Sequence, residues 1–210
     1  MNDVLMMEKL HASYFAPNCP VMITKIPRPI MNELDVWVKE SRRFKDSPLS
    51  SLKAHENVGY SNRKKHNTYQ CSVPTHLVEN SFWLAWTLRL AAKYWGMGKD
   101  HRHFKLRKWD GHFDGYDIWT NFSYKGDDNP EHNHAGLLSG VIYYKNHKHP
   151  TIFTEYSHPT YSCECEGPDG HMIMFPSRTL HMVNPQMENK ERITLAFNLV
   201  ANNEFPALNA

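Results

Sequence analysis

The sequence predicts a mainly β protein with N-terminal helices, in which the strands form a jelly roll, the cupin-like double-stranded β-helix. The main observation is a series of short β-branched or aromatic segments after Gly96, separated by Gly, Pro, Asp and Asn. Seven or more such strands within about a hundred residues are typical of a sandwich or barrel. A second observation is the helical periodicity of two segments before Gly96. The composition, 40% apolar and 22% charged, is that of a globular chain.

The first half of the chain carries the helical patterns. The segment PIMNELDVWVKESRRFK predicts an amphipathic helix, and Pro29 suits its first turn. Residues 49–72 are rich in His, Asn, Lys and Ser, so we expect a long loop there. The segment THLVENSFWLAWTLRLAAKYWG predicts a second helix, with Thr75 as its N-cap and Gly96 ending it.

The strand signals lie in the second half of the chain. The predicted strands are HFKLRKWD, YDIWTNFSY, LLSGVIYYK, TIFTEY, TYSCECE, HMIMFP and RITLAFNLVA. At 210 residues the chain is expected to form a single domain. Within it, residues 1–97 are predicted to be mainly helical and loop support, and residues 98–203 to form the double-stranded β-helix.

Composition excludes several classes of protein. A net charge of +2 is too small to indicate nucleic acid binding, and we interpret the basic segments 62–66 and 101–108 as solvated faces, with His101 and His103 on the surface. No apolar run reaches membrane-spanning length, and the N-terminus lacks a secretory h-region. The four cysteines follow no disulfide or zinc-site spacing. We therefore expect reduced thiols and a cytoplasmic protein.

A pair of histidines stands at the mouth of an apolar run, in NPEHNHAGLLSGVIYY. Side chains at positions i and i+2 of an extended chain point to the same face, so His132 and His134 would project side by side. They could share one metal ion. A third histidine, His181, follows a predicted strand and a Pro-Ser turn.

An arginine and a threonine follow the third histidine on one predicted strand. Arg192 stands eleven residues after His181, and Thr194 lies on the same strand face. The guanidinium fork and the hydroxyl together suit a carboxylate. With fourteen histidines in the chain, an H-x-H pair alone is a weak signal. The order H-x-H, strands, His, Arg-x-Thr is far more specific.

This order resembles the iron(II)- and 2-oxoglutarate-dependent oxygenases, whose double-stranded β-helix carries an H-x-D/E motif, a distal histidine and a later basic residue. More closely, the chain is similar to oxygenases of bacteria and phages with the pattern WxN…G…HxH…SGVxYY followed by FPSxxxHxVxP…R…FN. The matching residues are Trp119, Asn121, Gly126, His132, His134, Ser139, Gly140, Tyr143, Tyr144, Phe175, Pro176, Ser177, His181, Val183, Pro185, Arg192, Phe197 and Asn198. A phage-encoded chain would act in the host cytoplasm.

The resemblance implies that Fe(II) is held by His132, His134 and His181. His134 departs from the broader family, which has a carboxylate at this position and so completes a 2-His-1-carboxylate triad. A three-histidine site and a site with only His132, His181 and water are both open alternatives. Glu131 and Asp128 are expected to orient a ligand imidazole.

The resemblance also implies that 2-oxoglutarate and dioxygen react at this site. Arg192 and Thr194 would hold the distant carboxylate of 2-oxoglutarate. Asn121 and Tyr143, from strands that should face the interior, would add hydrogen bonds to it, with interior packing as the alternative. The implied reaction hydroxylates a C–H bond of the substrate and releases succinate and carbon dioxide.

The substrate and two competing functions stay open. A peptide or amino-acid side chain is slightly favoured over another small molecule, and neither a membrane partner nor nucleic acid is expected; no pattern indicates an oligomeric state. Residues 49–72 and 109–117 are candidate lids. One alternative is a non-catalytic cupin-like module that binds metal or carboxylate. The other is a three-histidine iron dioxygenase that uses no 2-oxoglutarate, although neither needs the Arg-x-Thr pair.

Overall fold

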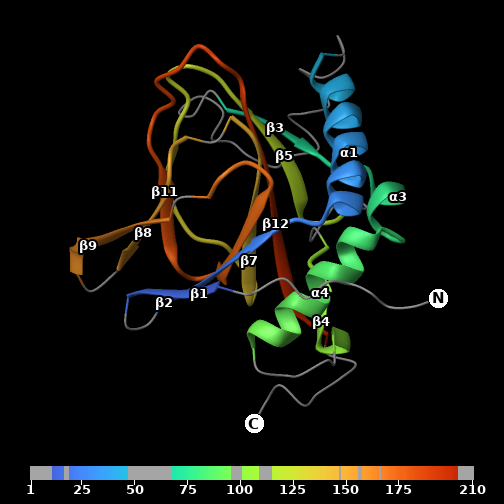
Figure 1. Cartoon of the computed structure of the whole chain (residues 1–210), viewed down its shortest axis with the longest axis horizontal. Coiled ribbons are helices and arrows are strands. Elements are labelled where there is room, and N and C mark those ends of the chain that lie inside the picture. Colours follow the sequence, from blue (N-terminus) through green and yellow to red (C-terminus); the bar gives the residue numbers. More distant parts are fainter. Residues whose placement is uncertain are drawn as a thin grey trace.

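Two antiparallel sheets face one another in the computed structural model, which describes residues 11–16, 19–46, 68–95, 101–108, 115–146, 148–155, 158–165 and 167–202 (Figure 1). The larger sheet has the order β1 (His11–Ala16), β2 (Cys19–Lys25), β10 (His171–Pro176), β7 (Leu138–Lys145), β12 (Arg192–Ala201), β5 (Ile118–Ser123) and β3 (Tyr69–Ser72), and β4 (Phe104–Leu106) also pairs with β12. The smaller sheet has the order β6 (Asn129–His132), β11 (Leu180–Val183), β8 (Thr151–Glu155) and β9 (His158–Cys165). This architecture confirms the predicted jelly roll with N-terminal helices.

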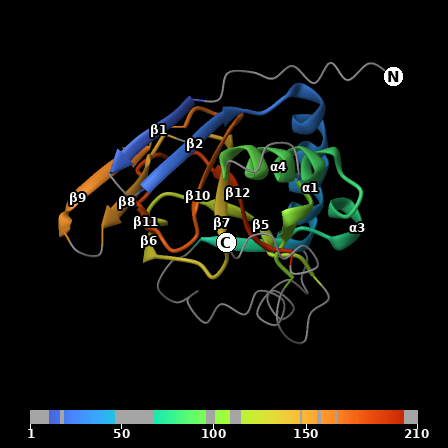
Figure 2. The same ribbon diagram turned by 90° about the horizontal axis from the view of Figure 1, so that it is seen from below.

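Helices cover the outer face of the larger sheet. α1 (Arg28–Asp46) and α4 (Phe82–Tyr94) lie on the side away from β8 and β9 (Figure 2). The ring of Trp83 packs edge-on against Trp37, with centroids 5.2 Å apart, and against Phe197 of β12 at 5.1 Å. The Glu33 carboxylate of α1 accepts hydrogen bonds from the first two main-chain N–H groups of α4. The helices are thus fixed to each other and to the sheet.

Alternation along the strands separates the core from the inter-sheet space. On β12, Ile193 and Leu195 belong to the core under the helices, whereas Arg192 and Thr194 line a cavity between the sheets. The same period of two, which is inherent to an extended strand, operates on β5. The cavity-lining residues from β5 and β12 are Trp119, Asn121, Ser123, Arg192, Thr194, Ala196 and Phe197.

A second, smaller apolar cluster lies between the two sheets. It contains Val21 of β2, Phe153 of β8, Phe175 of β10 and Cys165 of β9, all buried. The rings of Phe153 and Phe175 also approach His181, with centroids 6.3 and 4.8 Å away. This cluster therefore packs beside one of the candidate histidines.

The first half of the chain contributes more strand than the sequence indicates. Strands β1, β2 and β3 come from the segment 1–97 that we predicted to be helix and loop. β2 lies inside the larger sheet, between β1 and β10. β3 occupies the end of the predicted loop 49–72, whose residues 49–67 lie outside the described residues, as does the basic segment 62–66. β2 and β3 pair with strands distant in the sequence, β10 and β5, whereas β1 pairs with the adjacent β2.

The second predicted helix is divided in two. α3 (Thr75–Val78) ends before α4 begins, and Thr75 is its first residue rather than its N-cap. The functional cap is Ser81, whose Oγ accepts a hydrogen bond of 3.1 Å from the Leu84 main-chain N–H at the start of α4. Gly96 lies outside the described residues.

Three smaller predictions also concern the described residues. His103, expected at the surface, is only 9% exposed in a short 3-10 helix (His101–His103) beside α4. Cys71 and Cys165 are both buried. Among the described helices, none is long and apolar enough to cross a membrane.

Candidate metal centre and its cavity

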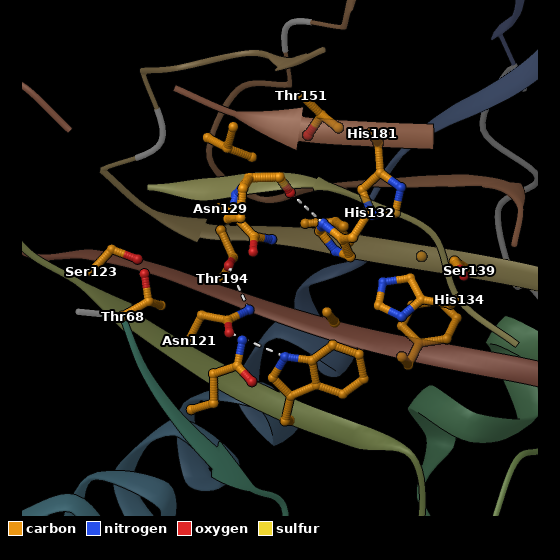
Figure 3. A pocket seen from close by; sticks show the side chains of 18 of the residues that line it. Thr68, Asn121, Ser123, Asn129, His132, His134, Ser139, Thr151, His181 and Thr194 are labelled. Carbon is orange, nitrogen blue, oxygen red and sulfur yellow. Dashed lines mark hydrogen bonds between the residues drawn. The ribbon is translucent and has the colours of Figure 1, made fainter. Parts of the chain in front are cut away.

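Three histidines converge between the sheets, and we call them the three-histidine cluster: His132, His134 and His181 (Figure 3). His132 ends β6 and lies directly opposite His181 of β11, while His134 follows two residues after β6. Ring centroids lie 4.3 Å apart for His132 and His181, 4.9 Å for His132 and His134, and 5.2 Å for His134 and His181. One potential ligand atom from each ring lies within 4.8 Å of the others.

Main-chain carbonyls orient two of the rings. His132 Nδ1 is hydrogen-bonded to the Pro130 carbonyl at 2.7 Å, and His181 Nδ1 to the Thr179 carbonyl at 3.0 Å. Because a carbonyl only accepts, each Nδ1 carries the proton. The lone pair of a neutral ring is then on Nε2, which is the arrangement of a metal-binding imidazole.

The sequence had suggested carboxylates for this orienting role. Glu131 instead accepts a hydrogen bond of 2.6 Å from the Thr154 hydroxyl of β8. The main-chain oxygen of Asp128 accepts one of 3.2 Å from the Thr68 hydroxyl. The rings of His132 and His181 are instead hydrogen-bonded to carbonyls two residues earlier in the chain, those of Pro130 and Thr179.

Burial keeps two rings of the cluster, those of His134 and His181, neutral. Burial, followed by the neighbouring His132 and Arg107, lowers the pKa of His134 to about 3. Burial also lowers the pKa of His181 well below its usual range, and the nearby His132 and His134 add to this effect. Both rings are therefore unprotonated at neutral pH, which leaves their lone pairs available to a cation.

A buried guanidinium lines the same cavity. Arg192, at the start of β12, is only 4% exposed. Its Nη2 donates a hydrogen bond of 3.3 Å to Ser123 Oγ, whereas Nη1 has no hydrogen-bond partner among the described residues. Burial lowers the pKa of Arg192, and Asp127 and Tyr143 oppose that shift. A buried cation with an unused donor is a receptor for an anion.

A short hydrogen-bonded chain lies between the arginine and the histidines. Trp119 Nε1 donates to Asn121 Oδ1 at 3.1 Å, and Asn121 Nδ2 donates to Thr194 Oγ1 at 3.2 Å. Since the Thr194 hydroxyl accepts from Asn121, its own proton remains available to an acceptor in the cavity. Asn121 thus orients Thr194 as a donor.

Tyr143 contacts the cavity only through a neighbouring residue. It is completely buried, and its hydroxyl is hydrogen-bonded at 2.8 Å to Thr151 Oγ1, which lines the cavity although Tyr143 itself does not. Burial raises the pKa of Tyr143, so the phenol stays protonated. Gly167 packs on its ring so closely that an added Cβ would lie 1.7 Å from Cε2. The sequence did not reveal Thr151 or Ser123, although Ser123 stands two residues after Asn121 on the same strand.

The cavity has a volume of about 330 Å³. Figure 3 shows the three imidazoles at one end, Ser123 and Thr68 at the other, and Asn121 and Thr194 between them. Because Arg192 bonds to Ser123, the cation lies at the end remote from the histidines. The lining residues from strand edges and loops include Thr68, Gln70, Asn129, Pro130, Glu131, Asn133 and Val183.

Comparisons with known proteins bear on the fold. No family model and no curated protein matches the sequence. Among solved structures, a prolyl-4-hydroxylase from Pseudomonas putida superposes with a TM-score of 0.51 at 11% identity, covering 85% of this chain and 91% of that one. The chain shares the fold of that hydroxylase.

Two further structures are similar at lower scores. An oxidoreductase of the 2OG-Fe(II) oxygenase family from Burkholderia pseudomallei has a TM-score of 0.40 and 16% identity, covering 52% of this chain. The match spans 51% of the Burkholderia protein, about half its length. A candidate oxygenase from Shewanella oneidensis has a TM-score of 0.49 and 13% identity, covering 87% of this chain and 82% of that one. Function therefore has to be argued from the site.

Proposed function

We propose that the protein is an Fe(II)- and 2-oxoglutarate-dependent oxygenase that hydroxylates a C–H bond of a peptide, amino-acid or other small-molecule substrate, with release of succinate and carbon dioxide. One observation carries the proposal. The unpartnered Nη1 donor of buried Arg192 lines the same cavity as the three-histidine cluster. A protein that bound only a metal would have no use for that buried cation.

The donor set suits iron. His132, His134 and His181 offer neutral imidazoles, and imidazole nitrogen is a good ligand for Fe(II). The Nδ1 bonds of His132 and His181 leave Nε2 for the metal. Since all three ligands are uncharged, the metal would keep its full positive charge, which favours an anionic chelator such as a keto acid.

The remainder of the cavity suits 2-oxoglutarate, a short dicarboxylate with a keto acid at one end. The keto acid end would face the histidines, and the other carboxylate would bind Arg192 and the proton of the Thr194 hydroxyl. Asn121 holds that hydroxyl in its donating orientation. When bound, iron and 2-oxoglutarate supply the oxidising chemistry, and the protein supplies binding and orientation.

The lining also restricts the substrate. Glu131 is the one carboxylate among the described lining residues, and it already accepts a hydrogen bond from Thr154. Amide and hydroxyl groups make up most of the polar lining, including Gln70 and Asn129. An uncharged group presented by a larger molecule, such as a side chain of a peptide, fits a cavity of about 330 Å³, the lower end of the range for ligand sites.

The test is a calorimetric titration of protein loaded with Ni(II), an inert substitute for Fe(II). We expect metal binding that is lost in His132→Ala and in His181→Ala, and 2-oxoglutarate binding that requires the metal. Glutarate, which has both carboxylates but no keto group, should bind much more weakly than 2-oxoglutarate. Metal binding without 2-oxoglutarate binding would instead support a three-histidine dioxygenase that does not use this cosubstrate.

His134 needs its own variant, because two ligand sets were open from the sequence. We expect His134→Ala to bind Ni(II) more weakly than wild type, since its ring faces His132 and His181 at centroid distances of 4.9 and 5.2 Å. Undiminished metal affinity in this variant would leave a site of two histidines and water.

A further inference from the structure

We propose that Asn198 is a positioning residue for His134 and acts through a buried polar network that holds the chain between residues 134 and 137. The proposal rests on the metal centre proposed above. We call the group the Asn198 network, and its members are Arg107, Asp117, Ser139, Ser177 and Asn198.

His134 differs from the other two histidines in how it is held. The rings of His132 and His181 are each fixed by an Nδ1 bond to a carbonyl two residues earlier. Among the described residues, no hydrogen bond reaches the His134 ring, whose nearest aromatic neighbour outside the cluster is Trp119 at 5.7 Å between centroids. The position of this ring therefore depends on its main chain.

That main chain is tightly constrained. The His134 N–H donates to the Ser177 carbonyl at 2.9 Å, and the Leu137 N–H donates to the Leu199 carbonyl at 2.8 Å. Between them Gly136 has a φ of +142°, and an added Cβ would lie 2.9 Å from Leu199 O and 3.0 Å from Ser177 Oγ. A side chain has no room here, so the loop lies directly on β12 and on Ser177, the residue after β10.

Asn198 connects the elements that support this loop. Its Oδ1 accepts a hydrogen bond of 2.6 Å from Ser139, and Ser139 is also bonded to Ser177 at 3.0 Å between the two hydroxyls. On its other side, Asn198 Nδ2 donates to Asp117 Oδ2 at 2.7 Å. All four side chains are 2% exposed or less. Asn198 thus links the residue that holds the His134 N–H to a buried carboxylate.

Arg107 connects the Asn198 network to the loop that follows His134. Arg107 Nη1 lies 3.7 Å from Asp117 Oδ2 and donates a hydrogen bond of 3.3 Å to the Ala135 carbonyl, one residue after His134. The main chains are also joined, since Arg107 N–H donates to Asn198 O and Asp117 N–H donates to Arg107 O. Residues on both sides of the His134–Ala135 peptide are therefore held by one network with Asn198 at its centre.

The energetic cost of burying polar side chains supports a positional role for Asn198. Buried charged and polar groups stabilise a fold less than apolar side chains of the same volume, but they specify one arrangement when every member is bonded. Asn198 does not line the cavity, so it cannot contact a ligand there. Its effect on the metal has to pass through the loop and His134.

A double-mutant cycle with Co(II) tests this pathway. The proteins are wild type, Asn198→Ala, His134→Ala and the double variant, with Co(II) affinity measured by calorimetry and coordination by visible absorption. We expect Asn198→Ala to weaken Co(II) binding by about 10- to 100-fold, the usual effect of residues that orient metal ligands. We expect its Co(II) spectrum to shift towards that of His134→Ala, and the double variant to bind no more weakly than His134→Ala alone.

Ser41→Ala is the matched control, because the hydroxyls of Ser41 in α1 and Thr120 in β5 form a fully buried pair at 3.0 Å. Neither residue lines the cavity. Ser41→Ala should leave the Co(II) affinity and spectrum unchanged. Additive losses in the cycle, or an unchanged Co(II) spectrum in Asn198→Ala, would overturn the positioning role while the metal centre stands. If Asn198→Ala does not fold, Ser177→Ala, which breaks the same network at a residue that does not line the cavity, decides by the same criteria. Wild-type protein that binds no Co(II) would overturn the metal centre and this proposal together.

Discussion

Replacing Arg192 separates binding of the cosubstrate from binding of the metal. Its guanidinium is buried at the end of the cavity remote from the histidines, with Nη2 on Ser123 and Nη1 available to a carboxylate. Removing it in Arg192→Ala should therefore weaken 2-oxoglutarate binding and leave metal affinity unchanged.

The size of the effect follows from these contacts. A hydrogen bond to a charged group contributes about 1.5–3 kcal/mol. Because the buried carboxylate of Asp127 already balances part of the guanidinium charge, we expect about 2 kcal/mol for Arg192→Ala, roughly a thirtyfold loss in affinity. Arg192→Lys keeps the charge but loses the planar fork, so its loss should be smaller. Thr194→Val removes one hydroxyl and should cost least, about 0.5–1.5 kcal/mol.

The assay is calorimetric titration of each Ni(II)-loaded variant with 2-oxoglutarate, preceded by titration with Ni(II) itself. Wild-type cosubstrate affinity in Arg192→Ala would place the carboxylate receptor elsewhere. Loss of Ni(II) binding in the same variant would make Arg192 a structural residue. Either result refutes the reasoning from the unused Nη1 donor.

Three other predictions follow from buried groups in and near the site. Because the pKa of His134 is lowered to about 3 and that of His181 well below its usual range, the unfolded chain takes up protons that the folded chain does not. The free energy of unfolding of the metal-free protein should thus be highest above about pH 6.5 and fall by about 1.4 kcal/mol per histidine per pH unit below it. A urea unfolding midpoint that does not fall on acidification would contradict this. Gly140→Ala should lower the melting temperature, because the added Cβ would lie 2.2 Å from the buried Phe197 ring and such overpacking costs about 1–3 kcal/mol. An unchanged melting temperature would show that the ring can move. Asp127→Asn should bind 2-oxoglutarate more tightly in calorimetry by removing a competing carboxylate, and weaker binding would argue against that role.

The sequence predicts the strands of the second half that are rich in β-branched and aromatic residues or alternate in polarity, including the three-residue β4, and misses β6 and β11. β7 and β12 are long and rich in β-branched and aromatic residues, which is a strong local signal. β6 and β11 have four residues each, and β6 contains Pro130, so no local pattern marks them as strands. β2 pairs with the preceding β1 and with β10, about 150 residues later in the chain, and the second pairing leaves no local trace.

In the candidate site too, local sequence patterns identify some residues and miss others. Spacing of two residues and the order of motifs were enough to group His132, His134 and His181, and to place Arg192 with Thr194. The partners of these residues depend on strand register, which the sequence does not reveal. Ser123 meets the arginine because β5 pairs with β12 in that register, and the Asn198 network joins five residues between positions 107 and 198.

Anaerobic titration of the Fe(II)-loaded protein with 2-oxoglutarate tests the central claim most directly. A keto acid that chelates Fe(II) through its carboxylate and keto oxygen gives the complex a weak visible charge-transfer absorption, which neither component has alone. The proposed function predicts that this band appears and saturates with 2-oxoglutarate, needs His132 and His181, and requires a higher concentration in Arg192→Ala. Fe(II)-loaded protein that develops no band at millimolar 2-oxoglutarate would contradict the claim that this cavity binds the metal and the cosubstrate together.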